Sequence, residues 1–223
     1  MIFKFFKFLK QNRISFCITN GYEDIINGID TQSDIDILFK KSDFLMIEKS
    51  IQKFSKEENI QLVQILHHDL FAKNIFLYNP KDQTFLNLDI YGELSRNNIV
   101  FFDEKDIFST IKDYQNIPIL SAEKEFVYYL IKKIDKTNIT KSNFLHLRSL
   151  YLRKEETINK YLKNYFKYHF EIIIESFKED KIDKIIKNIL ILKKDFYKTI
   201  SNESNRFKNL IRTIKRIFNP TGI

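Results

Sequence analysis

The first hundred residues contain short stretches in which polar and apolar residues alternate. Alternation with a period of two predicts β-strands, because successive side chains of a strand project to opposite faces of a sheet. The pattern predicts strands at residues 14–20, 34–40, 61–67, 74–78 and 85–91. The third and fourth of these are expected to pair in a meander, and Asn79-Pro80-Lys81-Asp82 is typical of a turn.

Helices are predicted where apolar residues recur at intervals of three and four. This spacing occurs at residues 3–12, 44–58, 122–134 and over most of 141–218. Ser121 precedes the third of these segments and is a candidate N-cap. Residues 22–33 contain Asn27, Gly28 and Asp30, which favour a loop with room for one helical turn.

The order of these elements defines the expected fold class. We expect an α+β protein, with a small mixed β-sheet and flanking helices followed by a C-terminal helical domain. The change of pattern at Pro118 divides the sequence into domains at 1–118 and 119–223. With 4 Gly and 3 Pro in 223 residues, few positions interrupt long helices. The 22 Phe and 11 Tyr supply a large core.

Composition excludes several classes of protein. A single cysteine, Cys17, excludes an intrachain disulfide framework and favours a reducing, cytoplasmic location; its apolar surroundings indicate a small core residue rather than a nucleophile. No window offers the roughly 20 apolar residues of a membrane span, so stable membrane insertion is not expected. No known nucleic-acid-reading motif is present, so nucleic acid is not an expected partner.

The formal net charge of +8 lies entirely in the C-terminal third. Residues 1–150 hold 20 basic and 20 acidic side chains, whereas residues 151–223 hold 17 basic and 9 acidic ones. Lysines there alternate with apolar residues at helical spacing, which is typical of a solvated helix face. Residues 206–216 are predicted to form a basic amphipathic helix that docks on the core or on a partner.

Three carboxylates are the candidates for chemistry. Asp34 and Asp36 are two residues apart on one predicted strand, so both side chains project from the same face. Two carboxylates on one face repel each other, and a divalent cation removes that repulsion. Asp89 lies on a predicted strand that is otherwise mostly apolar, where an unpaired charge is costly. If the two strands are neighbours, the three carboxylates converge into a site for Mg²⁺ or Mn²⁺.

These residues carry a resemblance to a known superfamily. Gly21-Tyr22, then Ser33-Asp34-Ile35-Asp36-Ile37, with Asp89 downstream, resembles the DNA polymerase β-type nucleotidyltransferase superfamily. The run Asn20-Gly21-Tyr22-Glu23-Asp24 is more similar to the nucleotidyltransferase-like proteins of bacterial surface-polysaccharide loci. The resemblance covers residues 14–135.

The resemblance implies a metal-dependent enzyme that transfers a nucleoside monophosphate from a nucleoside triphosphate to a small-molecule acceptor, such as a glycan precursor. Asp34, Asp36 and Asp89 would then be both catalytic and metal-binding residues. Gly21, Tyr22, Ser33 and Lys132 would contact the nucleotide, although a solvated surface lysine is the competing interpretation of Lys132.

Two other functions stay open at this point. The superfamily usually has Ser or Gly where this sequence has Tyr22, which favours a catalytically degenerate scaffold that binds a nucleotide or a partner kinase. Residues 216–223 resemble the junction that leads to a thymidylate-kinase-like domain in two-domain relatives, but this sequence has no P-loop motif. The other alternative is an antitoxin-like transferase that adenylylates a protein.

Overall fold

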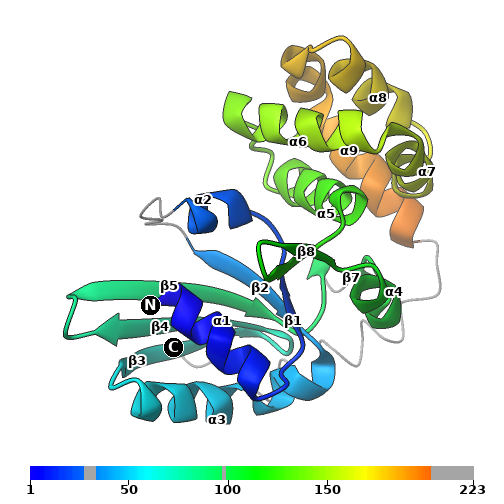
Figure 1. Cartoon of the computed structure of the whole chain (residues 1–223). Helices are drawn as coiled ribbons and strands as arrows, with labels where there is room; N and C mark the ends of the chain where they lie inside the picture. The colour runs from blue at the N-terminus through cyan, green and yellow to red at the C-terminus, as the bar shows by residue number, and fades with distance from the viewer. Residues whose placement is uncertain (28–33, 97–98, 202–223) are drawn as a thin grey trace. The chain divides into compact units, whose positions relative to one another are not determined.

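The computed structural model describes residues 1–27, 34–96 and 99–201 and confirms the α+β class (Figure 1). Within these ranges the chain forms two compact units. One comprises residues 1–95 and 100–120, and the other comprises Arg96, Ile99 and residues 121–201. No helix of the described part is long and apolar enough to cross a membrane.

The first unit is built on a mixed sheet of seven strands. The strands are β1 (Phe16–Ile18), β2 (Ile35–Phe39), β3 (Gln61–Asp69), β4 (Ala72–Asn79), β5 (Thr84–Tyr91), β8 (Lys112–Tyr114) and β9 (Ile117–Ile119). Their order is β3-β4-β5-β2-β1-β9-β8. The β2–β5 and β1–β9 pairs are parallel, and the other neighbours are antiparallel. All five predicted strands are confirmed, as is the meander of β3 and β4.

Two helices cover one face of this sheet (Figure 1). They are α1 (Ile2–Gln11) and α3 (Lys41–Glu57), at the positions that the apolar spacing predicts. Ile37 and Ile90 point from the sheet into the same core cluster as Phe5 of α1 and Ile51 of α3. All four side chains are fully buried. Because side chains alternate along a strand, the residues between these isoleucines lie on the opposite face.

Between β5 and α5 (Ala122–Asp135) the chain contains elements that the sequence did not predict. These are α4 (Glu104–Ser109), the short strands β8 and β9, and a separate two-stranded sheet of β6 (Ser95–Arg96) and β7 (Ile99–Val100). Each of these strands has two or three residues, too few for alternation to be recognised. In the predicted loop at 22–33, the one helical turn is α2 (Tyr22–Ile26). Residues 28–33 lie outside the described part.

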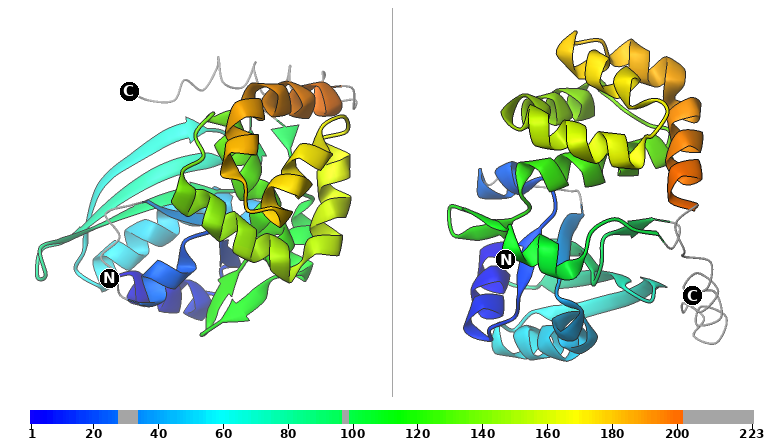
Figure 2. Two further views of the ribbon diagram at one scale, coloured as in Figure 1. Left: turned by 90° about the horizontal axis from the view of Figure 1, so that it is seen from above. Right: turned by 90° about the vertical axis from the view of Figure 1, so that its right-hand side faces the viewer.

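The second unit is helical, as predicted (Figure 2). It contains α5 (Ala122–Asp135), α6 (Lys141–Arg153), α7 (Glu155–Tyr165), α8 (Phe170–Lys178) and α9 (Ile182–Ser201). Phe177 of α8 is fully buried and contacts the rings of Phe126, Phe144 and Tyr151 at centroid distances of 4.9–5.7 Å. These aromatic contacts tie α5, α6 and α8 together. The predicted basic helix at 206–216 lies outside the described residues.

Ser121 corrects one sequence-based prediction. It does occupy the N-cap position of α5, with the extended backbone typical of a cap. Its hydroxyl, however, makes no capping hydrogen bond, and within the described part of the chain this buried oxygen has no partner. The position was predicted correctly, but the capping interaction was not, because side-chain orientation depends on the surroundings rather than on residue type.

Candidate active site

The carboxylates lie on the sheet face opposite α1 and α3. Asp36 of β2 stands directly beside Asp89 of β5, because the two strands pair in parallel with these residues in register. Asn74 of β4 stands on the other side of Asp89. Asp36, Asp89 and Asn74 therefore form one polar row across three neighbouring strands, with side chains on the same face. The structure thus confirms that the strand of Asp36 and the strand of Asp89 are neighbours in the sheet.

Asp36 is the most deeply placed of the three carboxylates, with 6% of its surface exposed. The side-chain amide of Asn20 donates a hydrogen bond to its Oδ2 at 2.8 Å. The hydroxyl of Tyr91 donates to its Oδ1 at 2.9 Å. Both oxygens therefore accept hydrogen bonds, which offsets part of the cost of burying the charge.

Each of the other two carboxylates accepts a hydrogen bond from an asparagine. The Asn74 amide donates to Asp89 Oδ1, and the Asn87 amide donates to Asp34 Oδ1. Asp34 precedes β2 and is exposed, so it lies at the rim of the polar face, whereas Asp89 is half-buried. The three carboxylates thus differ in exposure while sharing one kind of partner.

Tyr91 links Asp36 to Asp89. Its hydroxyl lies 2.9 Å from Asp36 Oδ1 and 3.2 Å from Asp89 Oδ2. A phenol carries one proton, so it can donate to only one of the two carboxylates at a time. The two carboxylates therefore share a single proton donor. A cation bound between them would compensate the negative charge that this donor leaves unbalanced.

The donor set fits a hard divalent cation. Mg²⁺ binds oxygen ligands and is commonly held by one or two carboxylates together with substrate phosphates and water. Asp36 and Asp89 supply such a pair on adjacent strands. Two buried amide oxygens on the same face, Oδ1 of Asn74 and Oδ1 of Asn87, accept no hydrogen bond from the described part of the chain. Among residues 1–27, 34–96 and 99–201, no group of three or more His, Cys, Asp or Glu side chains is placed to hold one ion.

The predicted nucleotide contacts are distributed over both units. Gly21 has φ +71°, in the left-handed region that favours glycine, and the described residues place no atom within 4 Å of a Cβ built there. Tyr22 has 4% exposure and packs against Tyr114 at a centroid distance of 5.2 Å. Ser33 lies outside the described residues. Lys132 lies in the last turn of α5, in the second unit, whereas the carboxylates belong to the first.

Cys17 is a core residue, as predicted. Its side chain is fully buried in β1, and burial raises the pKa of its thiol to about 12. The thiol is therefore protonated at neutral pH and is not a nucleophile.

Sequence reasoning missed four polar residues of this face: Asn20, Asn74, Asn87 and Tyr91. Two of them could have been found by the argument that placed Asp34 beside Asp36, because Asn87 and Tyr91 alternate with apolar residues on either side of Asp89. The position of Asn74 depends on the register between β4 and β5, which alternation alone does not fix.

Comparisons with known proteins do not identify a family. No family model matches the sequence, and no curated protein matches it. Among solved structures, JHP933 from Helicobacter pylori is similar with a TM-score of 0.45 and 12% identity, over 94% of this chain and 93% of that one. The polymerase core of TRAMP, an RNA surveillance complex, is similar with a TM-score of 0.28 and 11% identity, over 73% of this chain and 55% of that one. At these TM-scores neither similarity assigns a function to this chain.

Proposed function

We propose that this protein is a metal-dependent nucleotidyltransferase that transfers a nucleoside monophosphate from a nucleoside triphosphate to a hydroxyl of a small-molecule acceptor. The observation that carries the proposal is the in-register pair of Asp36 and Asp89 on adjacent parallel strands, joined by the Tyr91 hydroxyl. Asp34 at the rim of the same face supplies a further carboxylate. The sequence resemblance described above supports the same reaction.

The chain's own residues have distinct roles in this reaction. Mg²⁺, when bound, would supply positive charge to the triphosphate and to the leaving pyrophosphate. Asp36 and Asp89 would hold the ion, and Asp89 would also orient the acceptor hydroxyl. The acceptor oxygen forms a bond to the α-phosphorus, the bond from that phosphorus to the bridging oxygen breaks, and pyrophosphate leaves. The hydroxyl proton goes to the Asp89 carboxylate.

The environment of Tyr22 favours this enzyme over a degenerate scaffold. A bulky ring in the turn after Gly21 would obstruct a triphosphate if it were exposed. The ring is instead buried against Tyr114, so it does not stand free at the turn. Under this proposal the acceptor is a small molecule such as a glycan precursor, and the reaction belongs to bacterial polysaccharide biosynthesis in the cytoplasm. Modification of a protein acceptor is the alternative product, which labelling separates from a small-molecule product.

Calorimetric titration of the four ribonucleoside triphosphates, with and without Mg²⁺, tests the proposal. We expect one nucleotide to bind the wild-type protein only when Mg²⁺ is present. Asp36→Asn removes a charge from the cation site and should weaken that binding by at least about tenfold, or ~1.4 kcal/mol. Circular dichroism on the variant checks that the sheet is retained.

Asp183→Asn is the matched control, because it removes the same charge from an exposed residue in the first turn of α9. This variant should bind as the wild type does. If folded wild-type protein binds none of the four nucleotides with Mg²⁺, or if Asp36→Asn binds normally, the transferase proposal is wrong.

A further inference from the structure

The face that carries the carboxylates continues along the β4–β5 hairpin. On β4 the residues of this face are Asn74, Phe76 and Tyr78, and on β5 they are Asp89, Asn87 and Phe85. They stand opposite one another in three successive pairs, Asn74 with Asp89, Phe76 with Asn87 and Tyr78 with Phe85, without a bulge. We refer to Asn74, Phe76, Tyr78, Phe85 and Asn87 as the hairpin strip. It leads from the carboxylate Asp89 to the free end of the hairpin.

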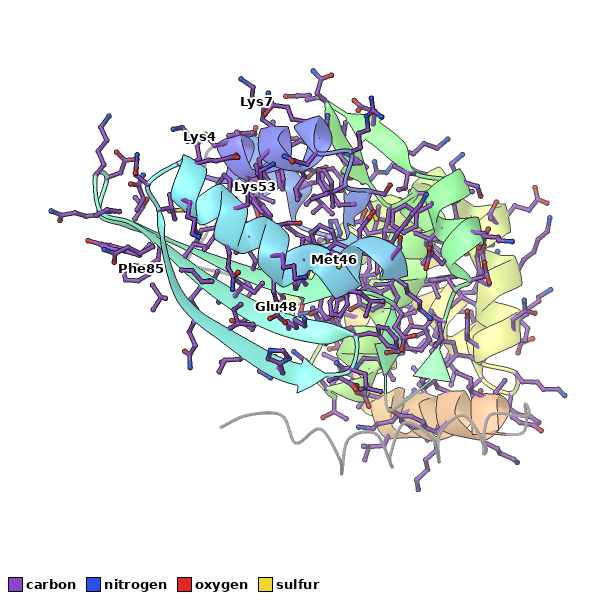
Figure 3. All side chains as sticks on the ribbon, turned by 90° about the horizontal axis from the view of Figure 1, so that it is seen from below. Lys4, Lys7, Met46, Glu48, Lys53 and Phe85 are labelled. Atoms are coloured by element: carbon purple, nitrogen blue, oxygen red, sulfur yellow. The ribbon has the colours of Figure 1, made fainter. Side chains whose placement is uncertain are left out.

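The outer end of the strip is an aromatic platform. The rings of Tyr78 and Phe85 lie 4.8 Å apart and are inclined by 38°. Phe85 is 71% exposed and projects from the end of the hairpin (Figure 3). Such an exposed aromatic pair offers flat apolar faces on which a ring of a ligand can stack. The core on the opposite face does not require a phenylalanine here.

The part of the strip nearest Asp89 carries two acceptors that accept no hydrogen bond from the described residues. The amides of Asn74 and Asn87 give their N–H groups to Asp89 and Asp34, respectively. Turning either amide around would place its oxygen against a carboxylate oxygen, so these orientations are fixed. The Oδ1 atoms therefore point elsewhere and accept no hydrogen bond within the described part of the chain. A buried acceptor without a partner is unfavourable, and a ligand that donates hydrogen bonds to it would remove that cost.

Charge and length restrict the ligand. The five residues of the strip carry no charge, and the side chain next to it is the carboxylate of Asp89. The strip has no cationic side chain to pair with the phosphates of a polyanion such as a nucleic acid. From Asp89 to Phe85 the strand advances by four residues, roughly 14 Å at about 3.4 Å per residue. The strip thus suits an extended, neutral molecule with apolar faces and many hydroxyl groups.

We propose that the hairpin strip is the binding site of a neutral carbohydrate acceptor. The C–H faces of one sugar ring lie on Tyr78 and Phe85, and hydroxyl groups of the same molecule donate to the amide oxygens of Asn74 and Asn87. Because these oxygens are covered by neighbouring side chains, binding is accompanied by small side-chain rotations, which are common at binding sites. The assignment of this sugar as the acceptor rests on the proposed transferase function, since it brings one hydroxyl to Asp89. The binding itself does not depend on that function.

Saturation-transfer NMR on the full chain tests this site without requiring catalysis. The probes are maltotriose, cellotriose and tri-N-acetylchitotriose at millimolar concentration, with the nucleoside uridine as a stacking competitor that lacks a phosphate. We expect saturation of the ring C–H protons of at least one oligosaccharide. Phe85→Ala should remove at least about 90% of this signal, because it removes the more exposed half of the platform.

Three further variants separate the possible outcomes. Phe3→Ala removes another exposed phenylalanine, on α1, which covers the opposite face of the sheet (Figure 1), and should leave the signal unchanged. Asn87→Ala should weaken it without unfolding the protein. Asp36→Asn should leave sugar binding intact while nucleotide binding is lost, so failure of the transferase proposal is seen separately. The carbohydrate proposal is overturned if no oligosaccharide binds, if binding persists in Phe85→Ala, or if uridine binds in the same Phe85-dependent way and the sugars do not.

Discussion

A carboxylate within a sheet is stable when both of its oxygens find donors, and Asp36 shows how local residues achieve this. Asn20 follows β1, the neighbouring strand, and Tyr91 lies on β5, the neighbour on the other side. Each gives one hydrogen bond to Asp36. The carboxylate is thereby held in one orientation before any ligand is present. A charged side chain that is already oriented in this way needs no reorganisation when a substrate binds, which favours group-transfer chemistry.

Replacing Tyr91 tests this arrangement at the scale of one atom. Tyr91→Phe removes the hydroxyl and leaves the Asp36 and Asp89 carboxylates facing each other without a shared donor. We expect the free energy of unfolding to fall by about 1–2 kcal/mol. Urea denaturation in the absence of divalent cations measures it.

The control for this variant is Tyr114→Phe on the edge strand β8, where the side chain is 38% exposed and its ring packs against Tyr22. That change should alter stability by less than about 0.5 kcal/mol. Equal effects of the two substitutions would contradict the role given to the Tyr91 hydroxyl.

At the scale of elements, one carboxylate joins the end of α5 to α9 within the second unit. Asp135 Oδ2 accepts hydrogen bonds from Nε and Nη2 of Arg96 at 3.1 and 2.8 Å. Its Oδ1 accepts from the Tyr197 hydroxyl at 2.6 Å and lies 3.3 Å from Lys193 Nζ. Burial alone would raise the pKa of Asp135, but the hydrogen bonds from Tyr197 and Arg96 outweigh it and lower the pKa below its ordinary value of 3.8.

Asp135→Asn should therefore destabilise the protein at neutral pH. The amide cannot balance the charges of Arg96 and Lys193, and we expect a loss of about 2 kcal/mol in the free energy of unfolding. Chemical denaturation followed by circular dichroism measures this loss. Asp180→Asn is the comparison, because Asp180 pairs with Arg148 at 3.5 Å and its side chain is 53% exposed. Its replacement should cost less than about 0.5 kcal/mol, and a similar loss in both variants would argue against the Asp135 network.

For the molecule as a whole, the shifted groups define a pH range of constant stability. Three carboxyl groups have pKa values below their ordinary values: Asp135, Glu156 and Glu179. A lowered pKa adds stability above the unfolded-state value, and this stability is lost as the pH falls through the folded-state value. The bases Lys4, Lys178 and Lys184 have raised pKa values, mainly through hydrogen bonds to glutamates. Their contribution is present below 10.5 and is lost as the pH rises above it.

We therefore expect the thermal unfolding midpoint to be nearly constant between about pH 5 and pH 8 and to fall outside this range. Cys17 sets the upper limit, because its thiol ionises in the unfolded chain near the ordinary pKa of 9.0 but stays protonated in the folded chain, where the pKa is about 12. Differential scanning fluorimetry across a buffer series measures the profile. The acid decrease should be smaller in Asp135→Asn, which has already lost the partly buried carboxylate that titrates there. A midpoint that rises on acidification below about pH 4 would contradict the assignment of these shifts.

The sequence by itself determined the features that depend on local periodicity. Alternation of polar and apolar residues predicted the five longer strands and put Asp34 and Asp36 on one face. Apolar residues at intervals of three and four predicted α1, α3, α5 and the helices that follow. These features are local because side-chain direction repeats within a few residues, whatever the neighbours are. For the same reason the core faces could be assigned before the partners of each strand were known.

Tertiary structure alone decided which strands are neighbours and in which register. Asn74 faces Asp89, and Tyr91 reaches Asp36, only because β5 lies between β4 and β2. The three-residue strands β8 and β9 exist because β1 offers β9 its free edge, a partner about one hundred residues earlier in the chain. Pairing over such distances depends on burial and hydrogen bonds made by the whole sheet, which no short window of sequence contains.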